Sequence, residues 1–143
     1  MVVVRMWRRL FGGGGDEPLD PDRDDLVVVA ASFDDAEACS AALDRATGLD
    51  RDAPAVLRHH LRLPAGRVAE ASEIAGYDGY TVQGEPGLPG EDGLVDVLLR
   101  RVQVLDPLHC SQERSRMAGL AQRHDGVAEG WDALQPPTTA APH

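Results

Sequence analysis

The sequence predicts a single α+β domain in which helices cover one face of an antiparallel sheet. Strand-like apolar runs alternate with helix-like stretches across residues 25–134. From residue 55 onward their order is strand, helix, strand, strand, helix, strand, which is typical of the α+β class. The 143 residues suffice for one such domain and leave little for a second. Residues 1–24, which are glycine-rich and acidic, and the proline-rich residues 135–143 are predicted to be disordered tails.

A strand and a helix are predicted ahead of that six-element order. Residues 26–33 form a near-continuous apolar run, which is typical of a strand covered on both faces. Asp34 then begins a helix, and Glu37 follows it at the spacing of a capping box. Small and apolar residues at helical spacing give this helix a buried side, and Gly48 ends it.

The next three elements follow from the periodicity of the apolar residues. Residues 55–63 alternate, with leucines on one face and arginines on the other, so they predict a strand. Residues 64–76 place apolar side chains at helical spacing and predict a second helix. Residues 77–83 predict a third strand, which Gly79 weakens.

The second half of the chain continues the pattern. The remaining elements are a long acidic hairpin loop over 84–93, a strand over 94–105, a helix from Asp106 to Gly126 and a strand over 127–134. Asp106 has the residue type of an N-cap, and Pro107 suits the first helical position. The order from residue 55 is the split βαβ (βαββαβ) of the ferredoxin-like fold, with the helices on one face of an antiparallel sheet. The extra strand and helix precede it.

The chain is strongly acidic. Twenty-four Asp and Glu residues oppose fourteen basic residues, all of them Arg, for a formal net charge of −10. This balance excludes a sequence-independent nucleic-acid binder, which needs a net basic face, and it favours a basic protein partner. No apolar run approaches the roughly 18 residues of a membrane span. The basic segment around Trp7 could form a short membrane-contacting helix, but a frayed tail is favoured at its length.

No residue pattern predicts an active site, a cofactor or a metal ion. His59 and His60 are neighbours on a predicted strand and point to opposite faces, so they cannot both bind one metal ion. Cys39 and Cys110 lie too far apart in sequence to indicate a disulfide, and no histidine partner can be placed for a catalytic thiol. Asp96 is predicted to be solvated by the alternation of its strand. We therefore expect a cytoplasmic protein that is not an enzyme.

Trp131 leaves two interpretations open. It follows a glycine within the predicted last strand, and the chain has only two Trp residues. It could close the core beneath the third helix, or it could lie at the rim as an anchor for a protein partner, because Trp is enriched at binding hot spots. Closure of the core is favoured.

Residues 56–134 resemble the RraB family, the regulators of ribonuclease E activity B. The first similar piece is the strand Val-Leu-Arg-His-His-Leu at 56–61. The second is Ala-Gly-Tyr-Asp-Gly-Tyr-Thr-Val at 75–82, which is similar to the Gly-Tyr-Glu-Val that enters the next strand in the family. The third is the closing helix and Gly-Trp corner over 117–131. Here the family's Tyr-Asp-Gly-Trp is Ala-Glu-Gly-Trp, so the Tyr is lost.

The resemblance implies a non-enzymatic protein that binds ribonuclease E, through the arginine-rich scaffold region of that enzyme, and lowers its activity. The negative net charge of the chain agrees with this, because it is opposite in sign to an arginine-rich partner. Candidate contact residues are Trp131, Glu129, Asp132, Glu85, Glu91 and Asp92. We expect no cofactor, no direct nucleic-acid contact and a monomer or weak dimer. Two alternatives stay open: a ferredoxin-like small-ligand-sensing or dimerisation module, and an adaptor that uses the Trp7 segment at a membrane surface.

Overall fold

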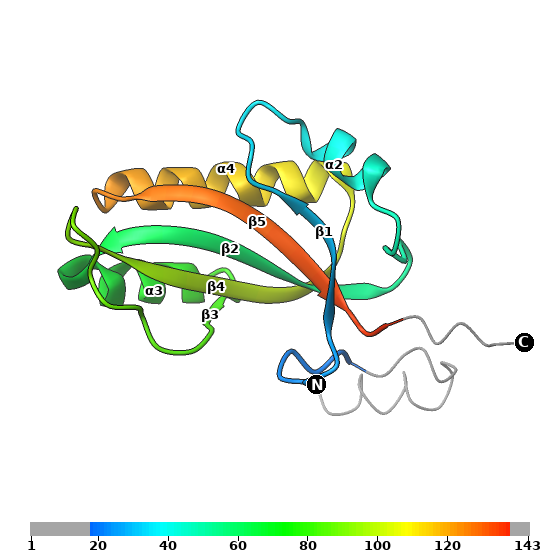
Figure 1. Ribbon diagram of the computed structural model, residues 1–143, viewed down its shortest axis with the longest axis horizontal. Helices are drawn as coiled ribbons and strands as arrows, with labels where there is room; N and C mark the ends of the chain where they lie inside the picture. Colours follow the sequence, from blue (N-terminus) through cyan, green and yellow to red (C-terminus); the bar gives the residue numbers. More distant parts are fainter. Residues whose placement is uncertain (1–17, 138–143) are drawn as a thin grey trace, which may run out of the picture.

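The computed structural model describes residues 18–137, which form a sheet with helices on one side (Figure 1). Within this part of the chain the sheet has five antiparallel strands in the order β1-β5-β2-β4-β3. The elements in chain order are β1 (Val27–Ser32), α2 (Cys39–Arg45), β2 (Pro54–Pro64), a 3-10 turn (Ala65–Arg67), α3 (Val68–Gly76), β3 (Thr81–Val82), β4 (Leu94–Val104), α4 (Pro107–Arg123) and β5 (Val127–Gln135). The predicted α+β class with an antiparallel sheet is confirmed.

The core lies between the sheet and the helices. On β2, Leu57, Leu61 and Leu63 are fully buried and face the helices, as the alternation in the sequence predicts. The buried side chains form two clusters, one around α3 and the end of α4 and the other around α2 and the start of α4. Because α4 supplies Met117 to the first cluster and Cys110 to the second, this helix ties the two halves of the core together.

β1 lies at the edge of the sheet and pairs with β5, where Ala30 stands opposite Ala133. The extra strand predicted over residues 26–33 is therefore part of the main sheet. It is not covered on both faces, however, because Val27 and Val28 are 45% and 54% exposed. Because neighbouring residues of a strand point to opposite faces, the first end of β1 is exposed on both faces of the sheet edge.

The first helix begins later than predicted. α2 starts at Cys39, and its N-cap residue Ala38 makes no side-chain hydrogen bond. Asp34 instead closes a turn by accepting from the backbone N–H of Ala36, and the carboxylate of Glu37 pairs with Arg45 at 2.7 Å. The predicted capping box is wrong because this ion pair takes the carboxylate that the box would need.

The third strand is much shorter than predicted. Tyr77 still donates its backbone N–H to Ile74 at 3.1 Å, so the chain leaves α3 through a turn. Gly79 adopts a φ of 86°, the left-handed region that favours glycine, and only Thr81–Val82 then pairs with β4. By contrast, α4 begins as predicted, with Asp106 accepting from the backbone N–H of His109 at 2.8 Å.

Both predicted tails are too long. Arg100 of β4 donates to the carbonyl of Pro21 at 2.9 Å and to Asp22 at 2.6 Å, which holds residues 18–24 against the sheet. At the other end Gln135 is only 4% exposed, and its amide bonds the backbone of the loop that begins at Asp50. The predictions for residues 1–17, the Trp7 segment included, and for 138–143 lie outside the described residues.

Gly126 is a position where the fold requires the absence of a side chain. A Cβ there would overlap the carbonyl oxygen of Arg62 and lie 2.6 Å from Leu63 Cδ2. We expect Gly126→Ala to lower the free energy of unfolding by about 2 kcal/mol, because a backbone atom of β2 cannot give way cheaply. Urea denaturation of the full chain measures this.

The matched control is Gly76→Ala, because a Cβ on Gly76 meets nothing within 4 Å. This variant should unfold within about 0.5 kcal/mol of the wild type or be slightly more stable, since Ala is the better helix former. Equal stability of the Gly126 variant and the wild type would contradict the packing described for this corner.

Candidate functional site

Among residues 18–137, one face of the sheet carries no helix, and this face is charged. The alternation of β2 sends Arg58, His60 and Arg62 to this helix-free face, away from the buried leucines. Asp96 and Arg100 of β4 stand beside them as cross-strand neighbours. Such a face could meet a charged partner, provided that its charges are not already neutralised within the sheet.

Asp132 is neutralised in this way. Its carboxylate accepts two hydrogen bonds from Arg58, both at 2.7 Å, and a third interaction from His60 Nε2 at 3.0 Å. Burial alone would raise the pKa of Asp132, but the hydrogen bonds from Arg58 and His60 outweigh it and hold the pKa below its usual range. With 5% of its surface exposed, Asp132 is an internal link between β2 and β5, not a contact residue.

Trp131 is fully buried as well. It belongs to the cluster that contains Leu43, Leu57 and Cys110, and none of its surface is exposed. Closure of the core is therefore confirmed, and the interpretation of Trp131 as a surface anchor is wrong. Trp131 is buried because β5 lies between β1 and β2 in the sheet, so a residue of β5 that faces the helices is covered on all sides.

The other predicted contact residues lie in the half of the sheet where β4 begins. Asp92 pairs with Arg62 at 2.7 Å, and Arg62 stands opposite Val127 at the start of β5. Glu85 and Glu91 are exposed in the same loop, and Glu129 is exposed near the start of β5. Three of the six predicted residues, Glu85, Glu91 and Glu129, are thus both exposed and without an ion-pair partner among residues 18–137. We call these three the free glutamates.

Because most arginines form ion pairs, the surface charges that remain unpaired are mainly carboxylates. In the described part of the chain, every arginine except Arg114 and Arg123 has a carboxylate oxygen within 3.5 Å, whereas the nearest one to Arg114, on Asp35, is 4.0 Å away. The surplus of carboxylates over arginines therefore remains as unpaired acidic groups. Net charge predicts such a surplus, whereas only the structure shows which acids it leaves free.

A buried polar cluster lies beneath α4, on the helix side of the sheet. The hydroxyl of Tyr80 donates to Glu113 at 2.8 Å and lies 3.4 Å from His59 Nε2, and Arg101 stacks 4.7 Å above the tyrosine ring. Burial lowers the pKa of His59 to about 4, so this histidine is neutral at pH 7. Burial opposes ionisation of Glu113, but Tyr80, Arg101 and Arg116 lower its pKa overall. The carboxylate of Glu113 is thus held by hydrogen bonds and ion pairs to Tyr80, Arg101 and Arg116.

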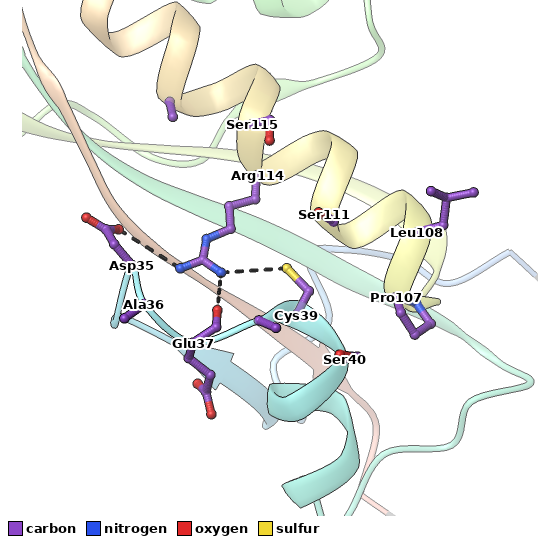
Figure 2. Close-up of a pocket in the computed structure, with 12 residues that line it drawn as sticks. Asp35, Ala36, Glu37, Cys39, Ser40, Pro107, Leu108, Ser111, Arg114 and Ser115 are labelled. Atoms are coloured by element: carbon purple, nitrogen blue, oxygen red, sulfur yellow. Dashed lines mark hydrogen bonds and ion pairs between the residues drawn. The ribbon is translucent and has the colours of Figure 1, made fainter.

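An open groove of about 680 Å³ lies between α4 and the segment that leads from β1 into α2 (Figure 2). Arg114 of α4 reaches across it and donates to the backbone carbonyls of Asp34 and Glu37. The same guanidinium lies 3.9 Å from Cys39 Sγ and 4.0 Å from Asp35. The sequence carries no local signal for this groove, because Arg114 and Cys39, which lie on its two sides, are 75 residues apart in the chain.

The two cysteines, distant in sequence, meet beside this groove. Both are free and buried, and they belong to the same core cluster. Burial raises the pKa of the Cys110 thiol, and its interaction with the Cys39 thiol raises it further. The Cys110 thiol therefore lacks the lowered pKa of a catalytic nucleophile, so we assign Cys110 a packing role.

Nowhere in residues 18–137 do three or more His, Cys, Asp or Glu side chains gather in a way that could hold a metal ion. No helix in that range has the length and apolar character needed to cross a membrane.

Comparison with known proteins identifies no relative. No protein-family model, no curated protein and no solved structure matches this chain. The resemblance to the RraB family accordingly rests on the three sequence pieces within residues 56–134.

Proposed function

We propose that this chain is a non-catalytic, RraB-like regulator that binds the arginine-rich region of ribonuclease E and slows RNA processing. The observation that carries the proposal is the charge pairing of the surface. Because the described arginines other than Arg114 and Arg123 are paired with carboxylates, most of the charged groups left to meet a partner are acidic. A basic, extended segment is the complement of such a surface, and long-range attraction would steer it there.

The topology supports the family-level part of the proposal. The order β5-β2-β4-β3, with every neighbouring pair antiparallel, agrees with a split βαβ ferredoxin-like arrangement to which β1 is added beside β5. The Gly-Trp corner of the resemblance has a packing role, since Trp131 is buried. We further propose that the protein acts in the cytoplasm, as a monomer or weak dimer, without touching RNA itself.

The first test is a titration of the full chain into full-length ribonuclease E and into its catalytic half alone. Binding and slower cleavage are expected only with the full-length enzyme, because the arginine-rich region lies outside the catalytic half. The binding should weaken steeply with added salt, since unpaired surface charges are screened within about 10 Å at 0.1 M salt. Binding to neither form, or equal binding to both, would overturn the proposal.

A variant locates the surface. Replacing the free glutamates together (Glu85→Gln, Glu91→Gln, Glu129→Gln) should weaken binding about tenfold or more and flatten its salt dependence. The matched control changes the charge by the same amount elsewhere on the exposed surface, with Asp24→Asn, Asp52→Asn and Glu73→Gln. If both variants lose the same affinity, the net charge alone is responsible and the free glutamates are not the docking surface.

A further inference from the structure

A small inner cavity adjoins the groove of Figure 2. Its volume is about 50 Å³, and it shares Asp35, Arg114 and Ala118 with the groove. Its inner wall comes from the sheet and includes His59 and Trp131. A single water needs roughly 10–15 Å³ of such space, so the cavity can hold more than one water molecule or a compact polar group.

The wall of this cavity contains an unsatisfied donor. Trp131 is fully buried, and its Nε1–H has no hydrogen-bond partner in the described part of the chain. A buried donor without an acceptor costs about 1–3 kcal/mol, so such groups are rare in folded proteins. Since Trp131 lines the cavity, a molecule that enters it and accepts a hydrogen bond would remove that cost.

The charge around the cavity selects an anion. The guanidinium of Arg114 is held by two backbone carbonyls, which do not neutralise it. Its nearest carboxylate, on Asp35, is 4.0 Å away and 95% exposed, and Glu37 is committed to Arg45. The low pKa of His59 means that this wall adds no second positive charge. The cavity therefore presents one cation, the Arg114 guanidinium, one neutral donor and the solvent-exposed carboxylate of Asp35.

We propose that the groove and its inner cavity bind a small carboxylic acid. The carboxylate occupies the inner cavity, where it accepts from Trp131 Nε1–H and pairs with Arg114. The rest of the molecule lies in the groove, whose volume of about 680 Å³ is in the range of small-molecule sites. Pro107 and Leu108 of α4 give that part of the groove an apolar side for a short hydrocarbon chain. This site is independent of the proposed contact with ribonuclease E.

The test uses the indole N–H resonance of Trp131 in the full chain. A Trp7→Phe background removes the other Trp, so a single indole signal remains in the ¹H–¹⁵N spectrum. Acetate, butyrate and butylamine are titrated separately at constant ionic strength, with chloride as the reference anion. A saturable shift of the indole signal is expected with the two carboxylates, larger for butyrate at a given concentration, and none with butylamine.

Ala118→Leu fills the shared wall of cavity and groove without removing a hydrogen bond, and it should abolish the shift. Gln112→Leu adds the same side chain to an exposed position of α4 outside the groove and should leave the shift intact. Arg114→Gln should weaken carboxylate binding about tenfold. The proposal is overturned if no carboxylate moves the indole signal, if chloride or butylamine moves it equally, or if Ala118→Leu leaves it unchanged.

Discussion

Asp132→Ala is expected to lower the free energy of unfolding by about 3–4 kcal/mol. Asp132 is 5% exposed, and its carboxylate is held by Nε and Nη2 of Arg58 and by His60. Removing it leaves the half-buried charge of Arg58 without its partner, and breaking a buried pair from one side typically costs about 3–5 kcal/mol. The lower part of that range applies because Arg58 keeps some contact with solvent. Urea denaturation at pH 7 gives the value.

Asp96→Ala is the control, because it also removes a carboxylate from an arginine on the helix-free face. Asp96 is 78% exposed and shares Arg62 with Asp92, so its loss should cost less than about 1 kcal/mol. Similar losses for the two variants would show that Asp132 is better solvated than the structure indicates.

The pH dependence of the same pair has a defined sign. The pKa of Asp132 is lower in the folded chain than in the unfolded chain, so the carboxylate contributes stability above its ordinary pKa. That contribution is lost as the pH falls through the folded-state pKa. The stability difference between the wild type and Asp132→Ala should therefore narrow below about pH 4 and be constant above about pH 5.

Local sequence signals predicted most of the fold. The alternation over residues 55–63 identified the buried face of β2, and Asp106 with Pro107 marked the start of α4. Both signals depend on neighbours within a few positions along the chain. The edge position of β1 and its pairing with β5 depend on how distant segments meet, so the apolar run over residues 26–33 could not reveal them.

The errors arose where a distant partner displaced a local one. Glu37 has the spacing of a capping box, but Arg45 and Ser32 take its carboxylate. Asp132 looks like a surface acid beside a Trp, yet Arg58 lies directly opposite it on β2. Neither partner can be identified from spacing alone, because each is chosen by the packing of the sheet.

The candidate site likewise has one part that the sequence predicts and one part that it does not. Composition predicted an acidic surface, and the loop over 84–93 with Glu129 supplied three exposed glutamates that the structure keeps unpaired. The groove and its inner cavity had no sequence signal, since Arg114 meets the segment after β1 only in the folded chain. Sites built across such a distance become visible only when the register of the sheet and the position of α4 are known.

Trp131→Ala is expected to lower the free energy of unfolding by about 4 kcal/mol, because it opens a cavity in the cluster between the sheet and α4. Leu108→Ala, at a position of the same helix that is 63% exposed, should cost less than about 0.5 kcal/mol. Far-UV circular dichroism in urea is the suitable measurement for both, since the substitution removes the fluorescence of Trp131.

Trp131→Phe separates the two roles of the side chain. The phenyl ring keeps much of the packing, and the lost Nε1–H has no acceptor among residues 18–137 whose hydrogen bond could be broken. The cost should therefore be about 1–2 kcal/mol, well below that of the alanine variant. In the presence of butyrate the wild type should gain stability. Trp131→Phe should gain less, because at a given ligand concentration a weaker ligand stabilises the folded state less. A phenylalanine variant as unstable as the alanine variant would mean that the indole N–H has a partner already, and the inner cavity would then lose the donor on which its role depends.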